Sequence, residues 1–274
     1  MSRQGLAAAL RRARTEAQLS EEAAAARLEC PRDQFRRIET GRASIRLAEV
    51  RTLLDLYGAA GDQRDRILSE ARKARDRSWW YPYADLVDAT FETQLILEDD
   101  AASMSTYQPN LVPGLLQTER YAWELIGTRS DIALEAVRRQ ASLRMMRQRV
   151  LSRDSPPRLA IVLDEAVLRR PVGGPAVMRE QYERLAQVAA APGFTIQVLP
   201  FKAGPHRAMG AGFHIYAFPD AQPPVVQLEL LDRVHFVADD TESAHYAAAF
   251  DHAAQCAYDP DRSLALLREL ARGD

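Results

Sequence analysis

Cysteine, lysine and long apolar runs are scarce in this chain of 274 residues. The two cysteines, Cys30 and Cys256, are far apart in the sequence, which excludes a disulfide framework or zinc cluster and favours the reducing cytoplasm. No run of about 18 apolar residues occurs, so we expect no membrane-spanning segment, and the charged N-terminus does not resemble a signal peptide. Only Lys73 and Lys202 are lysines among 36 basic residues. This bias towards arginine is typical of a GC-rich genome, and we expect a bacterial source.

The composition, with 47% hydrophobic residues, is that of a globular protein with one large or two smaller domains. The charge is unevenly divided, with 17 basic and 12 acidic residues in 1–77 but 19 basic and 26 acidic residues in 78–274. The net charge of −2 therefore hides a basic first piece and an acidic remainder. We predict two domains, 1–77 and 78–274, with nucleic-acid contact for the first, although a solvated helical surface explains the charge equally well.

Apolar spacing in the first piece predicts five short helices. The second helix begins after Ser20, and Pro31 opens the third, so the link between them is too short for antiparallel packing and favours a helix-turn-helix. The third helix points Phe35 and Ile38 inward. Its predicted outward face carries Arg32, Asp33, Gln34, Arg36 and Arg37. The guanidinium and amide groups on this face are planar groups of the kind that bind base edges and phosphates.

The segments LSEE (19–22), ARL (26–28) and FRRIETGR (35–42) resemble the Cro/cI-like, or XRE, helix-turn-helix family over roughly residues 3–75. The resemblance implies that Arg32, Asp33, Gln34 and Arg37 face the major groove, that Arg36 and Arg42 lie near phosphates, and that Arg14 and Glu39 form a structural ion pair. The chain departs from the family at Glu21, where many members have a glutamine that contacts a phosphate. Since a carboxylate repels a phosphate, we expect Glu21 to turn away, with weaker binding or a different docking angle.

The second piece is predicted to be α+β, so that the whole chain is multidomain, with an all-α domain followed by an α+β domain. Helices are expected over 83–104, 117–127, 131–151, 176–190, 241–258 and 262–271, with a break at 105–110. β-Branched runs predict a sheet of four or five strands, over 159–163, 194–199, 213–218, 225–230 and, as the fifth, 235–237. The helix over 176–190 is the expected crossover between the first two strands.

The segment YQPNLVPGLLQTERYA (107–122), with LDEAVLRRPVGG (163–174) and VLPF (198–201), resembles the C-terminal domain of actinobacterial XRE regulators of the WhiJ-like type. This resemblance implies a transcriptional regulator whose second domain has no settled role and which is often encoded beside a small partner protein, an arrangement proposed to be toxin–antitoxin-like. Physically, Pro113-Gly114 predicts a turn and Thr118 a helix cap. A structural corner and a partner- or ligand-binding surface both remain open for this segment.

No catalytic, metal or cofactor motif is predicted. His245 and His252 are seven residues apart on one helix, not the three or four typical of metal pairs. Asp164-Glu165 favours a salt bridge to Arg169 or Arg170 over acid–base catalysis. The polar loop 202–212 is the preferred site of ligand or partner contact, through Lys202, His206 and Arg207.

The sequence therefore predicts a cytoplasmic, sequence-specific DNA-binding transcriptional regulator that is not an enzyme. One helix-turn-helix offers few base contacts, so we expect a homodimer on a palindromic site, with the interface mainly in the second domain, which would also bind a partner protein or ligand. The alternative is an antitoxin-like or scaffold protein that acts mainly through a small partner protein.

Overall fold

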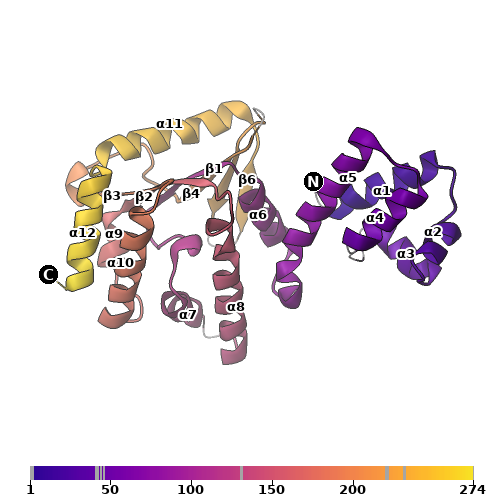
Figure 1. Cartoon of the computed structure of the whole chain (residues 1–274). Helices are drawn as coiled ribbons and strands as arrows, with labels where there is room; N and C mark the ends of the chain where they lie inside the picture. Colours follow the sequence, from indigo (N-terminus) through magenta and orange to yellow (C-terminus); the bar gives the residue numbers. More distant parts are fainter. Residues whose placement is uncertain are drawn as a thin grey trace. The chain divides into compact units, whose positions relative to one another are not determined.

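The computed structural model describes residues 3–40, 43, 45, 47–129, 132–219, 222–230 and 233–273. It contains two compact units, Met1–Pro82 and Tyr83–Asp274 (Figure 1). The division lies a few residues beyond the boundary expected after residue 77. The first unit is helical and the second combines helices with a sheet, so the predicted fold class is confirmed. Among the described residues, no helix is both long and apolar enough to cross a membrane.

The first unit packs five helices around one apolar core. They are α1 (Arg3–Glu16), α2 (Glu21–Arg27), α3 (Arg32–Glu39), α4 (Leu47–Leu56) and α5 (Gly61–Asp76), followed by the 3₁₀ helix η1 (Arg77–Tyr83). Leu10, Phe35 and Leu53, from three different helices, are each 0% exposed. Burying one such side chain stabilises the fold by about 1.5–3 kcal/mol, so the helix positions depend on this shared core.

The second unit contains a six-stranded mixed sheet in the order β3-β2-β1-β4-β5-β6. Its strands are β1 (Ser103–Gln108), β2 (Arg158–Asp164), β3 (Phe194–Leu199), β4 (Phe213–Ala217), β5 (Val225–Glu229) and β6 (Val234–Val237). Its helices are α6 (Ala89–Asp100), α7 (Glu119–Gly127), α8 (Leu134–Arg147), α9 (Glu165–Arg169), α10 (Pro175–Ala189), α11 (Asp240–Cys256) and α12 (Pro260–Arg272). Three short 3₁₀ helices are η2 (Gly114–Leu116), η3 (Gln148–Leu151) and η4 (Phe201–Ala203).

Strands β3, β2 and β1 are parallel, whereas β4, β5 and β6 pair antiparallel. The predicted crossover is confirmed, since α10 connects the parallel strands β2 and β3. Alternate residues of β2 point to opposite faces, as strand geometry requires. Leu159, Ile161 and Leu163 belong to one apolar cluster, with residues of α10 and α12, and Val162 belongs to another, with Phe250 of α11. Helix α11 therefore covers one face, while α7, α8, α10 and α12 lie on the other (Figure 1).

The expected count of four or five strands was wrong because it omitted β1. The predicted helix over 83–104 is limited to α6, and the expected break at 105–110 is mostly strand. The serines and threonine of β1 look like a turn in the sequence, yet β1 lies inside the sheet, between β2 and β4. Thr106 is buried there, and its hydroxyl hydrogen-bonds His214 Nδ1 at 3.0 Å. A polar central strand is possible here because its side chains find polar partners on β4.

Candidate nucleic-acid interface

The turn between α2 and α3 closes within a few residues. The amide of Leu28 donates to Ala24 O at 3.2 Å and that of Cys30 donates to Ala25 O at 3.1 Å. Glu29, between them, has φ of 51°, in the left-handed region that ends many helices. Pro31 is extended, with ψ of 144°, and α3 starts directly after it. The turn therefore has the helix-turn-helix form that the spacing predicts.

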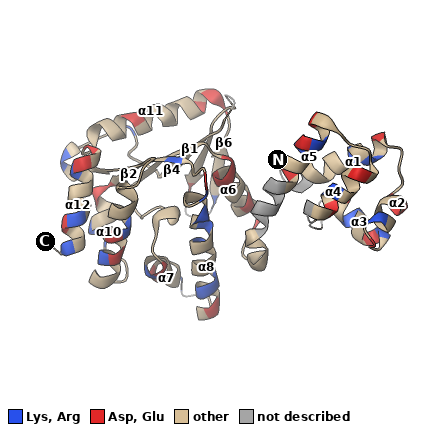
Figure 2. Ribbon diagram, viewed as in Figure 1, with Lys and Arg blue, Asp and Glu red and all other residues tan. Residues whose placement is uncertain are grey.

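Helix α3 has one buried face and one exposed face. Phe35, Ile38 and Glu39 are buried. The five predicted DNA-contacting residues of this helix are all exposed, namely Arg32, Asp33, Gln34, Arg36 and Arg37. Figure 2 marks the basic and acidic positions of the helix. Among the described residues, Arg36 and Arg37 form no salt bridge. Arg42, the sixth predicted DNA-contacting residue, lies outside the described residues.

Arg14 of α1 and Glu39 of α3 form a bidentate ion pair. Arg14 Nε lies 2.8 Å and Nη2 lies 2.9 Å from the two carboxylate oxygens of Glu39. Only 11% of the Arg14 side chain and 3% of the Glu39 side chain are exposed. The hydrogen bond to Glu39 raises the pKa of Arg14, against the lowering effect of burial. Arg14 Nη1 also donates to Leu19 O at 2.6 Å, so one guanidinium connects α1, the start of the α2 segment and α3.

Arg32 is held by the acidic start of α2. Its Nη1 lies 2.7 Å from Glu22 Oε1, and its Nε lies 3.4 Å from Glu21 Oε2. The charge of Glu21, which is expected to repel a phosphate, is thus partly balanced by Arg32. Arg32 differs from Arg36 and Arg37 in its surroundings, because its guanidinium is already paired with these two carboxylates.

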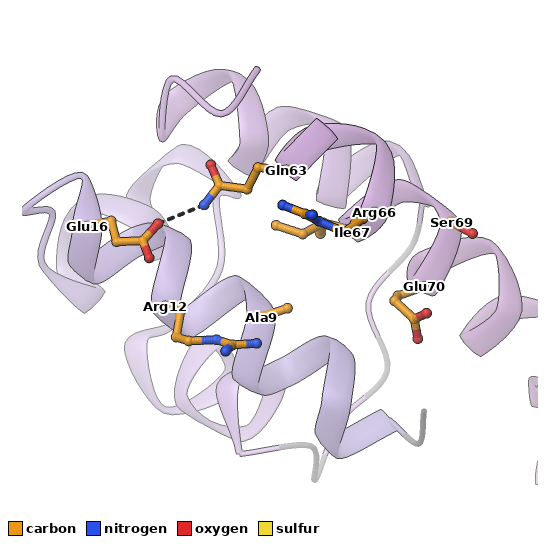
Figure 3. Close-up of a pocket in the computed structure, with 8 residues that line it drawn as sticks. All are labelled: Ala9, Arg12, Glu16, Gln63, Arg66, Ile67, Ser69 and Glu70. Carbon is orange, nitrogen blue, oxygen red and sulfur yellow. Dashed lines mark hydrogen bonds between the residues drawn. The ribbon is translucent and has the colours of Figure 1, made fainter. Parts of the chain in front are cut away.

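The first unit also has a groove between α1 and α5 (Figure 3). It is lined by Ala9, Arg12, Glu16, Gln63, Arg66, Ile67, Ser69 and Glu70. Gln63 Nε2 donates to Glu16 Oε2 across the groove at 2.7 Å. Two arginines face two glutamates in this lining, so the groove lacks the excess of positive charge that a phosphate backbone requires.

In the second unit, the predicted contact residues Lys202, His206 and Arg207 lie along one loop but have different surroundings. Lys202 Nζ lies 5.3 Å from the centroid of the Tyr258 ring, and the amide of Arg207 donates to His252 Nδ1 at 3.4 Å. His206 Nε2 is 3.4 Å from the hydroxyl of Tyr107, and burial lowers the pKa of this histidine. Its Nδ1 atom is buried and has no hydrogen-bond partner among the described residues.

The same loop exposes two large apolar side chains that the sequence analysis did not select. Phe201 is 61% exposed and Met209 is 65% exposed. They flank Lys202 and Arg207, which are also exposed. The loop 201–209 therefore combines apolar and basic groups on its surface, a composition typical of protein contacts.

The segment PGLLQT (113–118) is the centre of a hydrogen-bond network that sequence reasoning missed. Gln117 accepts from Arg144 Nη1 at 2.7 Å and donates to Val112 O at 2.7 Å. Gln148 Nε2 donates to the Gln117 carbonyl at 2.6 Å, and buried Gln181 bonds Leu116 O and Thr118 N, each at 2.8 Å. Thr118 caps α7, as predicted, by accepting from the amide of Tyr121. The motif thus connects η2 to both α8 and α10.

A second polar group is buried between α6, α8 and the sheet. Arg147 and Glu98 form an ion pair with side chains only 9% and 4% exposed. Burial and the neighbouring Arg147 lower the pKa of Arg144 to about 10. At the sheet, His214 Nε2 lies 3.6 Å from Glu229 Oε1. These residues come from distant parts of the chain. Apart from being ionisable residue types, nothing in the sequence indicates that they lie close together.

The candidate chemical groups considered in the sequence have structural roles here. Asp164 caps α9 by accepting from the amide of Ala166 at 2.8 Å. Glu165 pairs with Arg169 at 3.0 Å, as predicted. Within the described residues, no group of three or more His, Cys, Asp or Glu side chains could hold a metal ion.

Comparison with known families gives two matches that together cover most of the chain. A helix-turn-helix domain matches residues 6–67. A domain of unknown function, DUF5753, matches residues 91–269. No curated protein and no solved structure matches the chain. The first match gives the first unit the class expected from the α2–α3 turn, and the second covers nearly all of the α+β unit.

Proposed function

The chain belongs to the DUF5753 family and carries a helix-turn-helix DNA-binding domain, and from this premise we propose that it is a sequence-specific transcriptional regulator of the actinobacterial XRE, WhiJ-like type. The observation that carries the proposal is the exposed face of α3. It presents five polar side chains on a helix that is anchored from behind by Phe35, Ile38 and the Arg14–Glu39 pair. A helix of this kind, standing on a rigid core, fits the major groove of duplex DNA.

In this proposal the exposed groups have separate roles. Gln34 and Arg37, with Asp33, read base edges, since guanidinium, amide and carboxylate groups discriminate among bases in the major groove. Arg36 and Arg42 bind phosphates, which position the helix without reading the sequence. Arg32 contributes both to DNA contact and to neutralising Glu21 and Glu22. No catalytic step is assigned to the chain.

We assign homodimerisation and partner or ligand contact to the second unit. A single helix-turn-helix covers too few base pairs for useful selectivity, so two copies on a palindromic site are expected. The site of action of such a regulator is the cytoplasm, where the DNA is. The exposed Phe201 and Met209, with Lys202 and Arg207 between them, support a protein contact at loop 201–209.

The DNA-binding function is tested by gel shift with the DNA upstream of the protein's own gene. Retardation should weaken steeply with salt, because phosphate contacts release counterions. Arg37→Ala should reduce the preference for the specific site, by about 1–3 kcal/mol at one base pair, whereas Arg42→Ala should weaken specific and unrelated DNA alike. Arg12→Ala, in the α1–α5 groove, is the control with the same loss of charge. Wild-type binding by the Arg37 and Arg42 variants would exclude this assignment.

The exposed loop favours a second candidate function, that of an antitoxin-like or scaffold protein that acts through a small partner. The partner would be the product of an adjacent gene, and co-expression followed by co-purification tests for it. Under this alternative, Phe201→Ser with Met209→Ser should abolish co-purification while leaving the gel shift unchanged. If the protein is instead a regulator without such a partner, the wild type should bind DNA and no protein should co-purify with it.

A further inference from the structure

A groove on the second unit differs in chemistry from the one in the helical unit. It has a volume of about 500 Å³ and lies where the end of α8 and η3 meet the C-terminal half of α10 and the start of β3. Its apolar lining comes from Met145, Leu151, Val188 and Phe194. Leu151 and Phe194 also pack against the main core, so the apolar lining is continuous with a rigid part of the unit. The volume is within the range of small-molecule sites.

The charged residues that line this groove, within the described chain, are two arginines, Arg149 and Arg184, and no acidic residue is among the lining residues. Arg149 lies 3.8 Å from Asp99, but the same carboxylate lies 4.0 Å from Arg153, so one anion is shared by two guanidiniums. Arg184 donates to the amide oxygen of Gln148 at the long distance of 3.5 Å, and no carboxylate pairs with it among the described residues. Positive charge therefore exceeds negative charge here, unlike in the α1–α5 groove with its two glutamates.

We propose that this groove binds an amphipathic carboxylate, a small molecule with one carboxylate and an apolar tail, as the effector of the regulator proposed above. The half-buried guanidinium of Arg184 binds the carboxylate through paired N–H donors, a geometry that arginine favours. The tail lies against Met145, Leu151, Val188 and Phe194 and leaves water. Only the role of the bound molecule as an effector rests on the proposed function, since binding of the carboxylate itself does not require DNA.

The position of the groove connects it to the PGLLQT network. Gln148 lines the groove and accepts from Arg184, while its Nε2 donates to Gly114 O at 3.2 Å and to Gln117 O at 2.6 Å. A carboxylate on Arg184 competes with Gln148 for the same guanidinium. Binding of the carboxylate would therefore alter the hydrogen bonding of Gln148, which contacts the PGLLQT segment directly.

The test uses the full-length protein and three probes of equal chain length, octanoate, octan-1-ol and octylamine, with binding measured by isothermal titration calorimetry. We expect saturable binding of octanoate, and binding of the alcohol and the amine at least about fivefold weaker, because they lack the anion that pairs with arginine. Equal binding of octanoate and octanol would overturn the proposal, as would no octanoate binding. Binding of an acidic peptide in place of octanoate would also overturn it and would make the groove a protein-docking site.

Variants separate the two parts of the groove. Arg184→Ala should weaken octanoate binding about tenfold or more, and Arg184→Lys should weaken it less, since one charge remains without the paired geometry. Arg179→Ala, exposed on the same helix, is the matched control and should bind as the wild type does. Ala191→Phe, which fills the groove without changing its charge, should also abolish binding, so a result does not depend on one variant alone.

The DNA gel shift distinguishes failure of this inference from failure of the proposed function. Arg184→Ala without octanoate should retard DNA as the wild type does, because Arg184 belongs to the second unit and the α3 face to the first. If the protein binds octanoate but not DNA, the binding site is supported and its role as an effector site is excluded. If the protein binds DNA but the wild type and Arg184→Ala bind octanoate equally well, the proposed regulator function is supported and the proposed carboxylate site is excluded.

Discussion

The two units use their polar residues in opposite ways. In the helical unit, the arginines, glutamine and aspartate of α3 are exposed, and one buried ion pair anchors the helix that carries them. In the α+β unit, Arg147, Glu98, Gln181 and Gln227 are buried, and each is hydrogen-bonded to another side chain or to the main chain. The first arrangement suits a surface that meets a large anionic partner. The second costs desolvation energy, which points to a need for fixed geometry inside the domain.

The comparison also separates the kinds of contact that a sequence makes visible. The α3 face consists of neighbouring residues on one helix, so its composition and spacing are local. The network around Gln117 draws its partners from α8, η3 and α10, dozens of residues further along the chain. A motif of local residues can be interpreted before the fold is known, whereas a network of distant residues cannot.

The largest expected effect is in the interior of the second unit. Arg147→Ala should lower its free energy of unfolding by about 3–5 kcal/mol, because Glu98 is left buried without its partner. Urea denaturation followed by circular dichroism measures the change. Arg138→Ala, on the same helix but with a 66% exposed side chain, is the control and should change stability by no more than about 0.5 kcal/mol. A loss below about 1 kcal/mol for Arg147→Ala would mean that the network is not the rigid centre of this unit.

The Arg14–Glu39 pair should give the next largest effect, in the first unit. Glu39→Ala should lower stability by about 2 kcal/mol, since Arg14 keeps only its bond to Leu19 O and remains largely buried. DNA affinity should fall as well, because the pair orients α3. Thermal unfolding and the gel shift are measured on the same variant. An intact gel shift in a destabilised Glu39→Ala protein would show that the core alone orients the recognition helix.

How much was predictable follows from the same contrast. The five helices, the α2–α3 turn and the Thr118 cap followed from spacing and capping rules, and the strands β2–β6 from β-branched runs. Strand β1 was missed because Ser103 fell at the end of the predicted helix over 83–104, while Ser105 and Thr106 fell in the predicted break, and the polar partner of Thr106 is His214 from a distant strand. Gln117 was within a recognised motif, but its bond to Arg144 depends on how α8 packs, which the sequence does not specify.

A smaller effect is expected where the acidic start of α2 meets Arg32. Glu21→Gln should increase DNA affinity about threefold at low salt, because it removes a charge that repels phosphates and leaves Arg32 with Glu22 alone. Fluorescence anisotropy over a series of salt concentrations measures the change, which should shrink as salt rises. Asp65→Asn, exposed on α5, changes the net charge equally and should have less effect. Equal gains for both variants would mean that Glu21 acts only through net charge.

The smallest expected effect is the dependence of the second unit on acid, through Glu229. Burial raises the pKa of this carboxyl, but the hydrogen bond and charge of His214, with Arg147 and Arg144, outweigh it and lower the pKa to about 2 from an ordinary value of 4.5. A lowered pKa in the folded state stabilises the fold above pH 4.5, and this stabilisation is lost as pH falls from about 4.5 to about 2. Since 49% of the Glu229 side chain is exposed, solvent reduces the effect. Glu229→Gln should therefore flatten the stability profile of the unit slightly in that pH range, in urea titrations at a series of pH values, while Glu183→Gln, exposed on α10, should leave it unchanged. If Glu229→Gln does not alter the profile, the rigid polar interior of this unit is limited to the Arg147–Glu98 pair and the Gln117 network. Glu229, at the end of β5, would then contribute as little to stability as an exposed charge on the α3 face.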